Sequence, residues 1–99
     1  MLLPHARTLC DARSALAVLS DGASCIEASS AYEHVLITLD AIHGDDCPAI
    51  DTYGLPTHPD ALLNLATHAL DELKTHGIDE LHVELLLALL DNATMLDLH

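Results

Sequence analysis

Eight histidines stand among sixteen Asp and Glu residues in this chain of 99 residues, and both kinds of side chain can bind a metal ion. Two histidines follow an acid at the same spacing, in Asp40-x-x-His43 and Asp79-x-x-His82. Di-iron helical bundles carry Glu-x-x-His pairs with this spacing on facing helices. Helical periodicity turns His43 and His82 toward the apolar sides of their segments. They are therefore the candidate ligands of an alternative function, a metal site of His and carboxylate groups inside a helical bundle.

Three details make this metal site the weaker expectation. Asp40 projects away from the inward side of its helix, Asp79 stands where a helix N-cap is expected, and the first helical segment supplies no inward Glu. His43-x-x-x-Cys47 has a spacing that zinc accepts, but no second close pair completes a zinc site in the sequence. With acids and histidines at this density, such spacings arise by chance. We expect no cofactor and no bound metal. His43 and His82 are the weak candidates for metal ligands.

The chain also lacks the sequence patterns of the common catalytic sites. It contains no phosphate-binding G-x-x-x-x-G-K-S/T, no dinucleotide-binding G-x-G-x-x-G and no G-x-S-x-G around a nucleophilic serine. Its three cysteines form no C-x-x-C pair. Nothing in the sequence brings a cysteine and a histidine together as nucleophile and base. We therefore do not expect an enzyme.

Four segments repeat their apolar residues with the period of an α-helix, at about 7–20, 24–43, 59–76 and 79–92. Ser24 and Glu27 have the spacing of a capping box at the start of the second segment, while Gly22, Gly44 and Gly77 end the first three. No segment shows sustained alternation of apolar and polar residues. The sequence predicts an all-α fold, a small four-helix bundle in one domain, residues 1–99. A long loop, Gly44 to His58, separates the second and third helices.

Each helix should turn one side to a core of aliphatic residues, because the chain has no Trp or Phe and only two Tyr. The first core stripe is Leu9, Ala12, Leu16 and Leu19, and the second includes Ala28, Tyr32, Val35 and Leu39. On the fourth helix we place His82 and Leu89 inward. That orientation turns the acids Glu80, Glu84 and Asp91 outward.

The charge of the chain, −13 with only three Lys and Arg, excludes two classes of partner. A phosphate backbone and an anionic membrane both need Lys and Arg, so we expect no direct binding to nucleic acid and no membrane binding. No apolar run approaches the length of a membrane span, and the N-terminal residues lack the apolar stretch of a signal peptide. The odd number of cysteines argues against a disulfide framework. We expect a cytoplasmic protein.

A strongly negative surface attracts basic proteins. Leu87 lies in the same stripe as Glu80, Glu84 and Asp91, and apolar side chains among carboxylates are what a protein contact needs. Glu33 and Asp40 form a second acidic strip on the second helix. We predict a small regulatory protein that binds a basic protein partner, as inhibitors, immunity proteins and antitoxin-like adaptors do, with a homodimer as a further state. Besides the metal-binding bundle, a structural subunit of a larger assembly remains an alternative.

Overall fold

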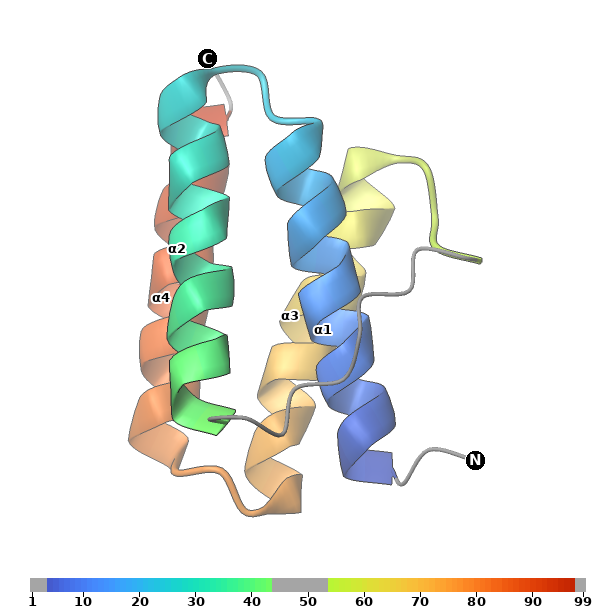
Figure 1. Ribbon diagram of the computed structural model, residues 1–99, viewed down its shortest axis with the longest axis vertical. Coiled ribbons are helices and arrows are strands. Elements are labelled where there is room, and N and C mark those ends of the chain that lie inside the picture. The colour runs from blue at the N-terminus through green and yellow to red at the C-terminus, as the bar shows by residue number, and fades with distance from the viewer. Residues whose placement is uncertain (1–3, 44–53, 98–99) are drawn as a thin grey trace.

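A computed structural model describes residues 4–43 and 54–97 of the chain. These residues form four α-helices and one short 3-10 helix, with no strand in the two described ranges. The bounds are α1 Pro4–Asp21, α2 Ile26–His43, α3 Pro59–Glu72, η1 Leu73–His76 and α4 Glu80–Asp97. The predicted all-α bundle is confirmed (Figure 1). α1 and α4 are longer than the sequence predicted, because α1 begins three residues earlier and α4 continues five residues beyond Asn92.

The four helices stand at the corners of a square, and each one packs against two neighbours. α1 contacts α2 and α3, and α4 contacts the same two helices, while no contact joins α1 to α4 or α2 to α3 among the described residues. α1 and α4 run in one direction and α2 and α3 in the other, so every neighbouring pair is antiparallel (Figure 1). Helices at opposite corners are therefore parallel.

This arrangement explains why the connection between α2 and α3 is long. The last residue of α2 and the first of α3 lie at opposite ends of the bundle (Figure 1). A helix of eighteen residues is about 27 Å long, so the connection must cover at least that distance. Residues 44–58 are enough, because an extended chain covers about 3.3 Å per residue. The length of the connection thus follows from the order of the helices. Asp45, Asp46 and Cys47 lie outside the described residues.

The turn from α3 to α4 follows the stop and start signals of the sequence. η1 ends at Gly77, whose φ of 96° is left-handed, and the Ile78 N–H donates to the Leu73 carbonyl at 3.2 Å. Asp79 then caps α4, because its carboxylate accepts the Leu81 N–H at 2.8 Å. At the other end of α3, His58 is the cap, and its Nδ1 accepts the Asp60 N–H. The cap expected at Asp79 is therefore confirmed.

The capping box predicted for α2 is wrong. The Ser24 hydroxyl donates to the carboxylate of Asp97, at the end of α4, instead of accepting a bond from the first turn of α2. The cap is Cys25, whose Sγ accepts the Ala28 N–H at 3.4 Å, and α2 begins at Ile26. The Ser24 hydroxyl, which the local pattern assigned to the cap, instead donates a hydrogen bond to a carboxylate of another helix.

The core is the aliphatic one that the sequence predicts for α1 and α2. All four residues of the stripe on α1 are buried, and so are Ala28, Tyr32, Val35 and Leu39 on α2, whereas Cys25 and Leu36, which helical periodicity places on the same side of α2, are only partly buried. α3 adds Leu62, Ala66, Ala69 and Leu70. Within the described ranges, the buried polar side chains are Thr8, Ser14 and Ser20, all on α1. No charged side chain is buried among the described residues.

The inward side predicted for α4 is wrong. The buried residues are Val83, Leu86, Leu90 and Ala93, whereas His82 is exposed and Leu89 is only partly buried. The true core stripe is thus shifted by one residue, about 100° around the helix. Because leucines surround α4 on nearly every side, their pattern did not define which side faces inward. The packing of α4 against α2 and α3, and not the period of the helix itself, determines which side of α4 is buried.

Candidate protein-binding surfaces

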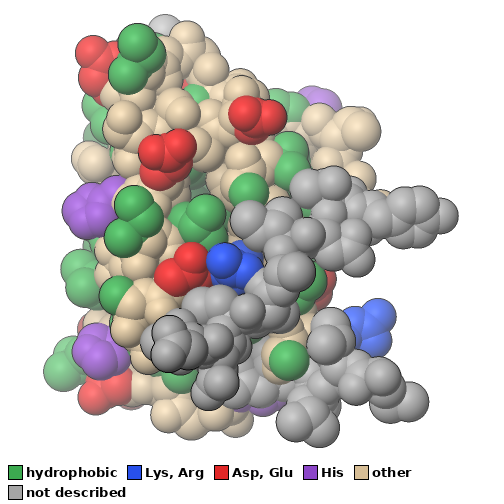
Figure 2. Space-filling view, in the orientation of Figure 1, with side chains coloured by type: hydrophobic (Ala, Val, Ile, Leu, Met, Phe, Trp, Pro, Cys, Tyr) green, Lys and Arg blue, Asp and Glu red, His purple; other side chains and the backbone are tan. Residues whose placement is uncertain are grey.

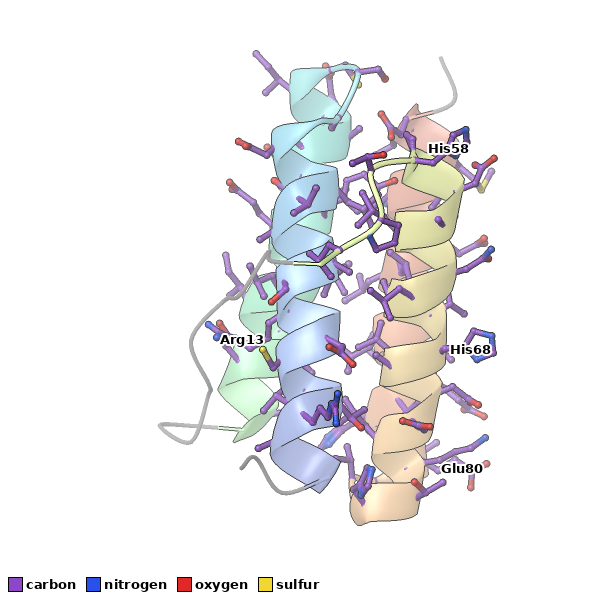
Figure 3. The ribbon with its side chains drawn as sticks, turned by 90° about the vertical axis from the view of Figure 1, so that its right-hand side faces the viewer. Arg13, His58, His68 and Glu80 are labelled. Atoms are coloured by element: carbon purple, nitrogen blue, oxygen red, sulfur yellow. The ribbon has the colours of Figure 1, made fainter. Side chains whose placement is uncertain are left out.

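Five exposed carboxylates lie on the side of the molecule formed by α3 and α4. We call this side the acidic face; its carboxylates are Asp60, Asp71, Glu80, Glu84 and Asp91. Glu80 projects outward on this side, near the η1 end of the bundle (Figure 3). Three of the predicted binding residues, Glu80, Glu84 and Asp91, therefore share one exposed face.

One cation lies at the edge of the acidic face. Lys74 of η1 forms an ion pair with Asp71, with 3.0 Å between Nζ and Oδ1. The bond to Asp71 raises the pKa of Lys74, and the nearby charges of Glu80 and Glu84 act in the same direction. Both partners are largely exposed, so the pair adds little to stability. Because Lys74 is one cation beside five carboxylates, the electrostatic potential over the acidic face stays strongly negative.

An apolar groove separates α3 from α4 within this face. Its volume is about 250 Å³, and it is lined by Leu63, Thr67, Leu87, Leu90, Asp91 and Thr94. Leu87 is half-buried in the groove, with Asp91 one helical turn further along. Of the residues predicted together on α4, Leu87 and Asp91 thus line the groove, whereas Glu80 and Glu84 precede it on the same helix.

The groove continues into a wider cleft at one end of the bundle. Leu63 and Thr94 line both hollows, and the cleft has a volume of about 310 Å³ with Leu19, Tyr32, Pro59 and Asp97 among its walls. Asp97 is fixed there by bonds from the Ser24 N–H at 2.7 Å, the Ser24 hydroxyl at 2.8 Å and the Tyr32 hydroxyl at 3.4 Å. The bond from the Ser24 N–H holds the pKa of Asp97 below its ordinary value. Asp97 is therefore an anion at neutral pH.

Glu33 and Asp40, the other two predicted binding residues, lie away from the acidic face. Both are on α2, and Asp40 faces α1. Asp40 accepts two bonds from Arg13 of α1, at 2.7 Å from Nε and 3.2 Å from Nη2. Arg13 lies at the opposite edge of the molecule from His68 and Glu80 (Figure 3). Asp40 is thus used in holding α1 to α2, and the six predicted residues do not form one site.

A second surface was not recognised from the sequence as a unit. The large hydrophobic side chains exposed in the described ranges are all on α2 and α4: Ile26, Ile37, Leu81, Leu85 and Met95. The packing of α2 against α4, which places their outer sides next to each other, was the missing information.

No metal site is found among the residues that the structure describes. No group of three or more His, Cys, Asp or Glu side chains in residues 4–43 and 54–97 is arranged to hold an ion. His82 is exposed to solvent, and the side chain of His43 lies outside the described part. One of the two histidines on which the metal alternative depended thus points away from the core.

Comparisons of the chain with protein-family models, with curated proteins and with solved structures each give no match. None of the helices in the described ranges combines the length and the apolar character that crossing a bilayer requires. The surfaces of the molecule are therefore the basis for assigning its function.

Proposed function

We propose that this protein is a small regulatory interaction protein whose acidic face binds a basic, amphipathic segment of a partner protein. The observation that carries the proposal is the apolar groove among carboxylates between α3 and α4. Leu63, Leu87 and Leu90 offer contact to apolar side chains, and Asp91 stands beside them. Such a groove takes the apolar side of a helix, and its acidic surroundings select a helix that also carries Lys or Arg.

The distribution of positive charge supports a basic partner. α2 and α4 contain no Lys or Arg, and the three cations of the chain are Arg7 and Arg13 on α1 and Lys74 on η1. Arg13 is paired with Asp40 and Lys74 with Asp71. The field over α3 and α4 is therefore little compensated from within the molecule. It steers a basic partner to this side and repels nucleic acid.

The proposal places the protein in the cytoplasm, where thiols stay reduced. Cys25 is a free thiol in the structure, which agrees with that location. No specific observation favours the metal-binding bundle or the structural subunit over this function.

The test uses a synthetic helical peptide of Leu and Lys in an amphipathic pattern, with a Leu and Glu peptide of the same pattern as its control. We expect the Lys peptide to bind, and amide NMR shifts to change along the groove, around Leu63 and Leu87. The Glu peptide should not bind. Shift changes spread evenly over the acids of all four helices would contradict the proposal, because they would show attraction without a site.

Matched variants locate the site independently. Glu84→Gln with Asp91→Asn removes two charges from the acidic face, and Glu27→Gln with Glu33→Gln removes two from α2. The first pair should weaken peptide binding about fivefold, since two exposed charge contacts together contribute about 1 kcal/mol. The second pair should leave the dissociation constant nearly unchanged. Equal effects of the two pairs would rule out the acidic face as the binding site.

A further inference from the structure

The outer sides of α2 and α4 together form an apolar strip. The bonds from Ser24 and Cys25 to Asp97 and Leu96 fix how these antiparallel helices are aligned. From that alignment, the level of Ile37 along the bundle is that of residues 84 and 85, and Ala41 is level with residues 80 and 81. Ile37, Ala41, Leu81 and Leu85 are all exposed, Leu81 by 72% and Ile37 by 65%. We call these four residues, with Ala88 and Asn92 further along α4, the α2/α4 strip.

The strip holds no Asp, Glu, Lys or Arg at its centre, and carboxylates lie along both of its edges. It does include His34, which is exposed on α2 seven residues before Ala41 and therefore on the same side of the helix. On α2, Glu33 and Asp40 turn toward α1, as the bond from Arg13 to Asp40 shows. On α4, the acids turn toward α3, since Asp91 lines the α3/α4 groove and the charges of Glu80 and Glu84 reach Lys74. Hydrophobic and His side chains gather along the edge where α2 lies in front of α4, and no Lys or Arg is seen there (Figure 2).

We infer that the α2/α4 strip is the contact surface for a second copy of this chain. A basic partner would find its carboxylates only at the edges of the strip, whereas the acidic face offers them beside a groove. The centre of the strip fits a surface that lacks Lys, Arg, Asp and Glu, and another copy presents such a surface in self-complementary form. Contacts of this kind, related by a two-fold axis, are the commonest in soluble oligomers.

The size of the strip is sufficient for a dimer of moderate strength. Two helices of eighteen residues, each about 27 Å long and about 10 Å apart, present on the order of 500 Å². Two copies would bury about 1,000 Å² in total, which is near the lower limit of stable interfaces. An apolar centre with a charged edge is the usual composition of such a contact.

The edges give this dimer a characteristic response to salt. Because neither α2 nor α4 carries a Lys or Arg, any two-fold pairing brings carboxylates of one copy toward carboxylates of the other. Salt screens this repulsion without weakening the aliphatic contact. The dimer should therefore become tighter as the salt concentration rises.

The test is sedimentation of the full chain over a range of micromolar concentrations, at low and at high NaCl. We expect a monomer–dimer equilibrium that shifts toward the dimer at high salt. Leu85→Glu and, separately, Ala41→Glu should each raise the dissociation constant about tenfold or more, because each buries a charge at the centre of the strip. Both positions are exposed in the monomer, so the helical circular dichroism should not change.

Asn64→Glu is the matched control. It adds the same charge to an exposed residue of α3, a helix that takes no part in the strip. Its dissociation constant should stay within about twofold of the parent chain. A chain that remains monomeric at high salt and high concentration would overturn the inference. So would a dimer that Asn64→Glu weakens as much as Leu85→Glu, or one that neither strip variant affects, since the contact would then lie elsewhere.

Discussion

Asp97 joins α4 to α2 and to the connection between α1 and α2, at the end of the bundle where the wider cleft lies. Its carboxylate accepts bonds from the N–H and hydroxyl of Ser24, which tie the connection between α1 and α2 to the last turn of α4. The hydroxyl of the buried Tyr32 reaches the same carboxylate from the side of α2. Burial raises the pKa of Tyr32 to about 12, and the charge of Asp97 adds to the shift. Tyr32 is therefore a neutral donor throughout the physiological range.

This pKa predicts how stability depends on alkaline pH. In the unfolded chain Tyr32 ionises near pH 10, whereas in the folded chain it stays neutral to about pH 12. Between these pH values Tyr32 ionises in the unfolded state but not in the folded state, and this ionisation stabilises the unfolded state. The free energy of unfolding should therefore fall by up to about 1.4 kcal/mol per pH unit over this range. Tyr32→Phe should lack this part of the loss, while Tyr53 contributes to both proteins. Urea unfolding from pH 9 to 12 measures the difference, and parallel curves would contradict the account.

At the scale of the elements, the sequence predicts where a helix begins and ends more accurately than which side of it faces the core. Gly77 and Asp79 were predicted to end one helix and begin the next, because a left-handed glycine and an aspartate cap act through neighbouring backbone groups. The first turn of α2 was not predicted correctly, because its Ser24 bonds to a residue 73 positions away. Local signals are reliable where their partners are local.

Gly77 and Gly22 form a matched pair for testing these helix ends. Both follow a helix, but only Gly77 has a positive φ, and an added Cβ would meet nothing within 4 Å there. Gly77→Ala should therefore lower the free energy of unfolding by about 1–2 kcal/mol through backbone strain alone. Gly22→Ala should change it by less than about 0.5 kcal/mol, since its Cβ would lie at an ordinary 3.5 Å from the Val18 carbonyl. Equal losses, measured by urea unfolding, would contradict this reading.

The sides of the helices show why the candidate site was only partly predictable. On α1, polar residues border Leu9, Leu16 and Leu19, so the buried stripe could be predicted from its period. α4 carries aliphatic residues toward the core, toward the groove and toward solvent, and only its packing against α2 and α3 distinguishes them. The acids of α4 were grouped correctly, because Glu80, Glu84 and Asp91 recur with helical spacing. Glu33 and Asp40 were joined to them without knowledge of which helices are neighbours.

At the scale of the whole molecule, the order of the helices produces two different surfaces on α4. Because α2 and α3 occupy opposite corners, α4 stands between them and presents one side with each neighbour. With α3 it forms the acidic face and its groove, and with α2 it forms the apolar α2/α4 strip. The two proposals use these separate surfaces, so one molecule of a dimer could still bind a basic partner.

The most direct test of this account is the dependence of both associations on salt. Sedimentation of the chain with the labelled Leu and Lys peptide, over a series of NaCl concentrations, measures peptide binding and self-association in the same samples. We predict that peptide binding weakens as salt rises, because it depends on the acidic face, while the dimer becomes tighter. Peptide binding that does not respond to salt would contradict the central claim, since the carboxylates around the groove would then not be selecting the partner.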